Sequence, residues 1–197
     1  MPTVATLAAV AASYLLGTFP SAMLAGRRRG VDPTRSGSGN PGTTNVLRTA
    51  GRQAAALTLV GDLGKGVAAA GLGWLAGGHE LGVLCGVAAV VGHVAPVTRR
   101  FRGGKGVATA VGVLLVVYPL LALFAIAVFA LACAATRIVS VGSIAAAATA
   151  PIAAAAGGIR GVELAALVAC GALVVARHAG NIRRLASGEE SGATLRR

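Results

Sequence analysis

The chain alternates long apolar runs with short polar segments. Its first three apolar runs cover residues 3–25, 53–76 and 81–96. Residues 107–136 are apolar throughout, about 45 Å of helix, which is too long for a single crossing of a bilayer. Pro119 is expected to divide this run into a short helix and a longer one, because proline ends or kinks a helix.

Two further runs, 139–156 and 162–176, bring the number of predicted spans to seven. Three arginines at positions 27–29 follow the first run, whereas a signal peptide carries its positive charge before the apolar core. We therefore predict an uncleaved first span, which Pro20 can kink near its end. The pattern as a whole predicts one all-α, polytopic membrane domain over residues 1–197.

Positive charge is distributed unevenly along the chain, which has 18 Lys and Arg against six Asp and Glu. With seven spans and the N-terminus outside, the positive-inside rule places nearly all cations on the cytoplasmic side. They lie in residues 26–52 and 99–105, at Arg137, and from Arg177 onward, whereas Arg160 lies outside. One helix instead of two before Arg137 would put that arginine and the tail outside. We therefore predict a cytoplasmic C-terminus, polar clusters that all face the cytoplasm, and almost featureless outer loops.

Composition argues against several other classes of protein. Cys85, Cys133 and Cys170 lie inside apolar runs, where a thiol behaves as a small hydrophobic side chain. Since CxxC and HExxH spacings are absent, we expect neither a disulfide framework nor a metal site, and no cofactor is implied. Aromatic residues make up 4% of the chain, too few for extensive stacking on bases, so a nucleic-acid partner is not expected.

Two polar segments are rich in glycine. GSGNPGTTNVLRTAG occupies residues 37–51, and GGKG at residues 103–106 leads directly into a predicted helix. Glycine lets backbone N–H groups approach an anion, and a helix N-terminus adds partial positive charge. Neither segment is a Walker A loop, and neither follows a strand, as a dinucleotide-binding motif requires. Phosphate binding and simple turns at the membrane surface both remain open.

Lysine is rare in this chain, which has Lys65, Lys105 and 16 arginines. Lysine offers a compact point charge, so Lys105 in its glycine-rich segment is a candidate phosphate ligand. Lys65 lies within a span, three residues after Asp62, which is helical spacing for an ion pair. An ionisable residue inside a membrane indicates function by default, and a purely structural pair is the alternative.

Histidine supplies candidates for proton transfer. His178 follows Arg177 and precedes Asn181 by about one helical turn, and its ordinary pKa of about 6.5 suits a general base. His93 ends the third apolar run. For each histidine, the alternative is a polar residue at the membrane boundary without a role. Ser38 and Ser143 are candidate nucleophiles. No Ser-His-Asp order is evident, so these serines are predicted to hydrogen-bond substrate rather than attack it.

These segments resemble, in order, the signature motifs of the bacterial integral-membrane acyl-phosphate:glycerol-3-phosphate acyltransferases. GSGNPGTTNVLRTAG resembles the family's GSGN-x-G-x-TN-x-x-RT-x-G. GHVAPVTRRFRGGKGVATA resembles GH-x-FP-x-F…F-x-GGKGVAT, and ARHAGNIRRLASGEE resembles RH-x-x-NI-x-RL-x-x-GxE. GDLGKG and SVGS match as well, so the resemblance covers nearly the whole chain. Ala95 and Thr98 replace aromatic residues of the second motif and Arg99-Arg100 adds charge there, but the candidate phosphate ligands are retained.

The resemblance implies transfer of a fatty acyl group from acyl phosphate to the sn-1 hydroxyl of glycerol 3-phosphate. The implied products are 1-acyl-glycerol 3-phosphate (lysophosphatidic acid) and phosphate, formed at the cytoplasmic face of the bacterial inner membrane. The H-x-x-x-x-D signature of thioester-using acyltransferases is absent. Implied partners are the two substrates and membrane lipid, with a peripheral acyl-phosphate-forming enzyme as the donor's source. The protein is expected to act as a monomer.

The resemblance also implies roles for individual residues. Candidate catalytic residues are Lys105, His178, Asn181, Ser143 and Arg177. Candidate substrate- and phosphate-binding residues are Ser38, Gly39, Asn40, Thr44, Asn45, Arg48, Asp62, Lys65, His93, Gly103, Gly104 and Gly106. The base is either His178 or the substrate's own phosphate, and the second is favoured because no carboxylate–histidine pair is apparent in the sequence.

Two other functions are alternatives to the enzyme. A small transporter of an anionic phosphorylated solute predicts polar residues spread through several spans toward the outer face, whereas here they crowd at one side. A purely structural membrane scaffold leaves the glycine-rich segments unexplained.

Overall fold

The computed structural model describes residues 3–190, in which every regular element is a helix. The elements are α1 (Val4–Gly17), α2 (Ser21–Arg27), α3 (Thr43–Val94), the 3-10 helix η1 (Val97–Arg99), α4 (Val107–Val117), α5 (Pro119–Thr136), α6 (Val139–Ala156), α7 (Gly161–Arg177) and α8 (Ala179–Ala186). The predicted all-α class is therefore confirmed for this part of the chain.

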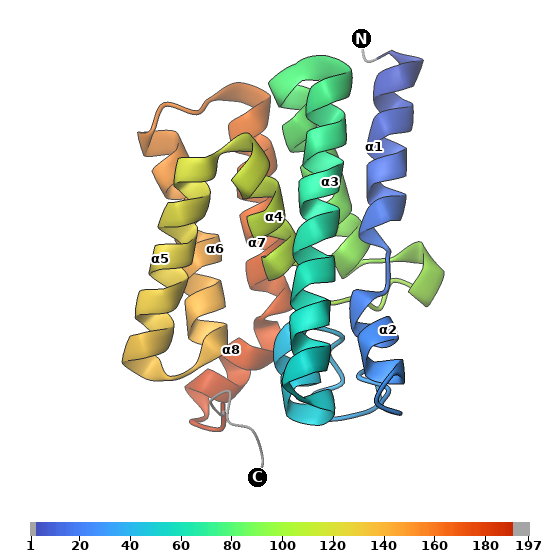
Figure 1. The fold of residues 1–197 in the computed structure, drawn as a ribbon. Coiled ribbons are helices and arrows are strands. Elements are labelled where there is room, and N and C mark those ends of the chain that lie inside the picture. The colour runs from blue at the N-terminus through green and yellow to red at the C-terminus, as the bar shows by residue number, and fades with distance from the viewer. Residues whose placement is uncertain (1–2, 191–197) are drawn as a thin grey trace.

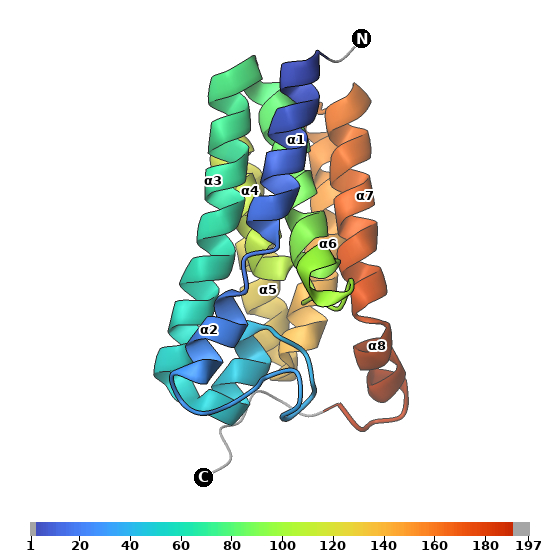
Figure 2. The same cartoon turned by 90° about the vertical axis from the view of Figure 1, so that its right-hand side faces the viewer.

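The helices form one bundle, with the polar segments gathered at one end. Figure 1 shows the loop between α2 and α3 at the same end as α8, and α1 beginning at the opposite end. The view turned by 90° shows the same arrangement (Figure 2). We call the end that carries residues 28–42 and α8 the polar end, and the end that carries residues 77–80 and 157–161 the far end.

The first apolar run is broken rather than kinked. α1 ends at Gly17 and α2 begins at Ser21, with Pro20 directly before it. Proline has no N–H to donate to the preceding turn and its ring crowds that turn, so a helix is kinked or, as here, broken at this residue. At the break, the Thr18 hydroxyl donates to the carbonyl of Leu15 at 2.7 Å. The prediction of a single kinked helix was therefore wrong at this point.

α3 contains two antiparallel runs and a further break near its start. Its backbone leaves helical geometry at Gly51 (φ 85°), at Gly77 (φ −157°) and at Gly78 (φ 80°). A φ of 80° lies in the left-handed region that favours glycine. Figure 1 shows the first run rising to the far end and the second returning beside it. These two runs correspond to the second and third predicted spans.

The division of residues 107–136 was predicted correctly. α4 ends at Val117 and α5 begins with Pro119, which sits at the first helical position where its missing N–H costs nothing. α4 is short, and in Figure 1 it begins part-way along the bundle rather than at its end. The polar segment that precedes it therefore reaches into the bundle.

Four helical stretches are long and apolar enough to cross a membrane: Val4–Arg27, Thr43–Arg99, Pro119–Thr136 and Val139–Ala156. α7 and α8 together make a fifth, bent by 53° where they meet. Because Thr43–Arg99 contains both runs of α3 and α4 is a shorter apolar helix, each of the seven predicted runs is recovered as helix, the first as two pieces.

Glycine allows the helices that carry the site to approach closely. A Cβ added to Gly66 in α3 would lie 2.2 Å from the carbonyl oxygen of Thr109 in α4. A Cβ added to Gly112 in α4 would lie 2.2 Å from the carbonyl oxygen of Leu63 in α3. The two helices thus touch backbone to backbone, a mode of packing typical of membrane proteins.

This contact predicts a position-specific loss of stability. Gly66→Ala should destabilise the protein by about 2 kcal/mol, because the new methyl group must push α3 and α4 apart. The matched control is Gly64→Ala, since a Cβ at Gly64 meets nothing within 4 Å. Thermal unfolding in detergent should show a lower midpoint for the first variant alone. Equal midpoints for the two variants would contradict this account of the packing.

Candidate active site

The polar end contains a cavity of about 620 Å³. Its wall includes most residues predicted to bind substrate: Ser38, Asn40, Thr44, Asn45, Arg48, Asp62, His93, Lys105, Gly106, Ser143, Arg177, His178 and Asn181. The other four predicted residues, Gly39, Lys65, Gly103 and Gly104, do not contribute to the wall. Folding therefore brings together segments that lie far apart in the sequence.

The loop at residues 28–42, the polar loop, is folded around Asn45. The Asn45 Nδ2 donates to the carbonyl oxygens of Pro33 (2.8 Å) and Ser36 (3.0 Å), and its Oδ1 accepts from the Ser38 N–H at 2.9 Å. Gly37 (φ 61°) lies so close that a Cβ there would stand 2.3 Å from Asn45 Oδ1. Asn45 therefore shapes the loop with its side chain while it also lines the cavity, and its role as a ligand stays a prediction.

The segment at residues 103–106, the glycine loop, is held from two sides. From one side, the carbonyl oxygen of His93 accepts the Gly104 N–H at 3.1 Å. From the other, the Arg177 guanidinium donates to the carbonyls of Gly103 (3.0 Å) and Gly104 (3.3 Å). Gly106 (φ 87°) then turns the chain into α4. Arg177, predicted to orient substrate, thus supports the loop that carries Lys105.

Lys105 belongs to a network centred on Glu190. Its Nζ donates to Asn181 Oδ1 at 2.6 Å, and Asn181 Nδ2 donates to Glu190 Oε1 at 2.5 Å. Glu190 also accepts from Ser140 Oγ (2.7 Å) and Arg184 Nε (2.6 Å). The sequence-based candidates did not include Glu190. The available signal was a pair of adjacent carboxylates, Glu189 and Glu190, in an otherwise basic C-terminal segment, the second of them at the end of the GxE motif.

The surroundings of Lys105 bring its pKa close to neutral pH. Burial lowers the pKa of Lys105 to about 8; the charge of Glu190 opposes this shift, whereas Arg184, Arg48 and Arg177 add to it. Burial alone would raise the pKa of Glu190, but its three side-chain hydrogen bonds outweigh burial and lower that pKa. At neutral pH, Lys105 is therefore mostly charged and Glu190 is ionised.

His178 is almost completely buried, with 2% of its surface exposed, at the junction of α7 and α8. Its Nδ1 lies 2.8 Å from the carbonyl oxygen of Val174. A carbonyl only accepts, so Nδ1 carries a proton and, in the neutral ring, Nε2 is left as an acceptor. The contact fixes the tautomer of His178 through a neutral carbonyl rather than through a carboxylate.

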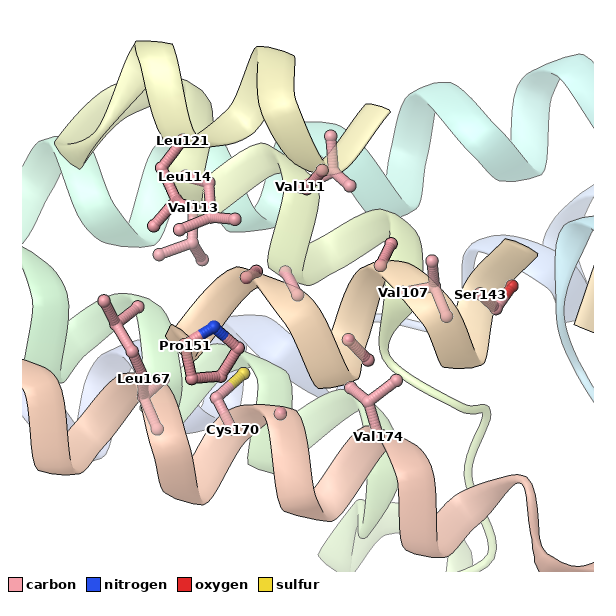
Figure 3. A pocket seen from close by; sticks show the side chains of 17 residues that line it. Val107, Val111, Val113, Leu114, Leu121, Ser143, Pro151, Leu167, Cys170 and Val174 are labelled. Carbon is pink, nitrogen blue, oxygen red and sulfur yellow. The ribbon is translucent and has the colours of Figure 1, made fainter. Parts of the chain in front are cut away.

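An apolar cavity of about 70 Å³ adjoins the polar one. The two cavities share Val107, Val111 and Ser143 in their walls, and Figure 3 shows Ser143 at one end of the apolar cavity. An open groove of about 720 Å³ along α6 and α7 shares Pro151 and Gly171 with the apolar cavity. α6 and α7 touch at these shared residues, since a Cβ added to Gly171 would lie 2.6 Å from the carbonyl oxygen of Ala147 and 2.9 Å from Pro151 Cγ. The apolar cavity therefore adjoins the groove across this contact.

Asp62 and Lys65 form the predicted ion pair, with Lys65 Nζ 3.0 Å from Asp62 Oδ1. The same carboxylate oxygen lies 3.5 Å from His93 Nδ1. No carboxylate–histidine pair was apparent in the sequence, but the structure contains this one. Its histidine is His93 rather than His178, and it lies 31 positions after Asp62, beyond the reversal in α3, so local spacing does not reveal the contact.

The far end was also wrongly predicted to be almost featureless. His79 Nδ1 lies 2.7 Å from Glu163 Oε1, and His79 Nε2 lies 2.7 Å from the carbonyl oxygen of Val117. The Tyr118 hydroxyl donates to the same carboxylate, and the rings of Trp74 and Tyr118 meet His79 edge to face. This cluster joins the reversal in α3, the α4–α5 junction and the start of α7.

The profile of the glycerol-3-phosphate acyltransferase family matches residues 7–188, which is nearly the whole chain. The chain belongs to this PlsY-type acyltransferase family. A glycerol-3-phosphate acyltransferase of Trichlorobacter lovleyi is 45% identical over 183 residues, covering 92% of this chain and 94% of that relative. One of Symbiobacterium thermophilum is 44% identical over 178 residues, covering 90% of this chain and 89% of the relative.

Solved structures of the acyltransferase family show the same fold. The glycerol 3-phosphate form of PlsY (YgiH), an integral membrane glycerol 3-phosphate acyltransferase, superposes with a TM-score of 0.90 at 36% identity, covering 95% of this chain and 94% of that one. Its lysophosphatidic acid form gives a TM-score of 0.88 at the same identity and coverage. The resemblance in the sequence motifs and the polytopic all-α membrane fold are thereby confirmed.

The Glu190 network predicts a specific effect on stability. Glu190→Gln should lower the free energy of unfolding by about 2 kcal/mol, because three hydrogen bonds to a carboxylate become bonds to a neutral amide with one mismatched group. Thermal unfolding in detergent measures the loss. Glu189→Gln, an exposed neighbour, is the matched control and should leave the midpoint unchanged. A Glu190→Gln midpoint equal to that of wild type would contradict the role of Glu190 as a hub.

Proposed function

We propose that this protein transfers a fatty acyl group from acyl phosphate to the sn-1 hydroxyl of glycerol 3-phosphate. The observation that carries the proposal is a single cavity whose wall carries Arg48 and Lys105 as well as apolar side chains such as Ile126 and Phe129. Such a cavity suits one anionic water-soluble substrate and one anionic lipid. The similar PlsY structures are those of its glycerol 3-phosphate and lysophosphatidic acid forms, which correspond to one substrate and one product of the proposed reaction.

Binding of phosphate is assigned to cations and main-chain amides together. Two anionic substrates repel each other unless positive groups hold them close, and fixed positions then contribute several kcal/mol to the rate. Lys105, Arg48 and Ser38 line the cavity, and α4 begins directly after Gly106 with its first-turn N–H groups. These groups would bind the phosphate of the acyl donor and help to hold the second phosphate nearby.

The chemical step forms an ester and breaks an anhydride. The sn-1 oxygen attacks the acyl carbonyl carbon, the bond from that carbon to the phosphate oxygen breaks, and phosphate leaves with the electron pair. Ser143, His178 and Asn181 would orient glycerol 3-phosphate in the cavity. The hydroxyl proton passes to a phosphate of the substrates, because His178 rests on the carbonyl of Val174 and lacks the carboxylate that would stabilise an imidazolium.

The acyl chain is assigned to the apolar part of the polar cavity's wall, where Ile126, Phe129 and Val139 lie. It would enter sideways from the bilayer there and place its carbonyl near Ser143. The walls of the adjoining small cavity are almost entirely hydrocarbon, as Figure 3 shows. An apolar wall of this kind keeps the chain out of water while the anhydride meets the polar part of the cavity.

The proposed orientation follows from charge. Seven spans with the N-terminus outside place the polar end, with its arginines and the site, on the cytoplasmic side of the inner membrane. A peripheral enzyme that forms acyl phosphate would supply the donor at the same face. The enzyme is proposed to act as a monomer.

Phosphate release by the purified protein tests the proposed function. Given palmitoyl phosphate and glycerol 3-phosphate in detergent or lipid mesophase, wild type should release phosphate only when both substrates are present, and palmitoyl-CoA should not replace the donor. Lys105→Ala should lower the rate at least 10²-fold, because the charge beside the leaving phosphate is lost. His178→Ala should retain activity within tenfold if a substrate phosphate is the base.

The rival transporter gives the opposite pattern. Folded wild type that releases no phosphate, while proteoliposomes take up labelled glycerol 3-phosphate, would falsify the acyltransferase assignment. A His178→Ala enzyme slowed by more than 10³-fold would instead return the role of base to His178.

The pKa of Lys105 predicts an alkaline limit to substrate binding. Lys105 is charged below its pKa of about 8 and neutral above it, so the KM of the phosphate substrates it contacts should rise as pH passes through 8. Lys105→Arg keeps its charge throughout this range, so its KM should stay flat there even if kcat is lower. Identical alkaline rises in both enzymes, after correction for spontaneous hydrolysis of the donor, would rule out Lys105 as the titrating group.

A further inference from the structure

A cluster of ionisable side chains is buried beside the glycine loop. The side chains of Lys65, Asp62 and His93 are 3%, 4% and 6% exposed. Lys65 Nζ is committed to Asp62 Oδ1 at 3.0 Å and to the carbonyl of Phe19 at 3.3 Å. A buried ion pair rarely adds net stability, because desolvating both charges costs as much as their attraction returns. The cluster therefore calls for a role other than stability.

His93 contacts the glycine loop with both its main chain and its ring. Its carbonyl oxygen accepts the Gly104 N–H at 3.1 Å. A Cβ added to Gly104 would lie 2.2 Å from His93 Nε2, 2.9 Å from Cε1 and 3.2 Å from Cδ2. A Cβ added to Gly103 would lie 2.1 Å from the His93 carbonyl oxygen. The loop thus rests directly on His93.

Backbone conformation does not explain the glycine at position 104. Unlike Gly106, whose φ is 87°, Gly104 lies outside the left-handed region, so an alanine fits its main-chain conformation. The three nearest atoms to an added methyl group all belong to the His93 ring. The absence of a side chain at Gly104 is therefore dictated by the imidazole.

The other side of the same ring faces Asp62. His93 Nδ1 lies 3.5 Å from Asp62 Oδ1 and is buried without a hydrogen bond in this structure. A shift of about 0.5 Å brings the two atoms to hydrogen-bonding distance. Lys65 and Arg99 are the cations that share the field of this carboxylate. The ring therefore stands between a fixed carboxylate and the loop.

We infer that His93, oriented by Asp62, is a positioning residue that sets the place of the glycine loop and hence of Lys105. This inference rests on the proposed function and deepens it, because the loop is assigned to phosphate binding. Displacement of such a group by about 1 Å costs on the order of 10²-fold in rate. Lys65 acts indirectly, because it neutralises the charge of Asp62, which orients His93.

A double-variant cycle tests this inference. His93→Asn keeps an amide that can donate to Asp62 but does not reach Gly104, and Gly104→Ala introduces the colliding methyl group. Each single variant should lower kcat/KM about 10²-fold. The double variant should be no slower than the slower single variant, because the methyl group then occupies the space left by the ring. Val91→Ala, on the same run of α3, is the matched control and should stay within twofold of wild type.

Three results would overturn the inference. They are a folded His93→Asn enzyme within threefold of wild type, a Gly104→Ala enzyme within threefold of wild type, and a double variant slowed about 10⁴-fold, the product of two independent losses. Unfolding midpoints are measured for every variant, since a purely structural role would lower them and leave kcat/KM of the folded fraction unchanged. If His93→Asn does not fold, His93→Ala takes its place in the cycle.

The same cycle is run on the affinity for glycerol 3-phosphate, by calorimetry without acyl donor. Wild type that binds glycerol 3-phosphate but transfers no acyl group would refute the proposed function. The dissociation constants of the four proteins would still test the inference about the loop. Non-additive effects of the two substitutions support it, and additive effects contradict it.

Discussion

The glycine loop is held by contacts from two helices that lie far apart in the sequence. The carbonyl of His93, near the end of α3, accepts from Gly104, and Arg177, at the end of α7, donates to Gly103 and Gly104. Because Lys105 lies in this loop and α4 starts directly after it, the positions of the cation and of the helix N-terminus follow from these contacts. The main-chain atoms of Gly103 and Gly104 make these contacts, and a side chain at either position would collide with His93. The contacts therefore require glycine at both positions.

Charge at the polar end is arranged so that cations stay in place before any substrate arrives. Lys105 donates a hydrogen bond to Asn181, which in turn donates to Glu190, and Glu190 also accepts a hydrogen bond from Arg184. Anchoring of this kind reduces the reorganisation needed when an anion binds, which is the main source of electrostatic catalysis. It also explains the place of Glu190 in a segment that carries several arginines: this carboxylate orients the cations without neutralising all of them.

The sequence predicted the features that depend on local pattern and missed those that depend on distant contacts. Hydropathy located the apolar runs, and Pro119 located the division between α4 and α5, because both effects act within a few residues. The break before Ser21 was underestimated, since a proline kink and a proline break have the same sequence signal. His93 meeting Asp62 and His79 meeting Glu163 are contacts between separate helical runs, so no spacing rule identifies them.

The shortness of α4 has a consequence for how the site responds to its surroundings. Its 11 residues rise about 16 Å, roughly half the thickness of the hydrocarbon core. The loop before it consequently lies deeper than the ends of α5 and α6, and its lysine is largely enclosed by protein. Dissolved ions screen exposed charges over about 10 Å in dilute salt, but they penetrate poorly into such a recess. Affinity for a phosphate held there should therefore vary little with ionic strength, whereas the attraction of an anion to the exposed arginines of α8 should weaken as salt rises.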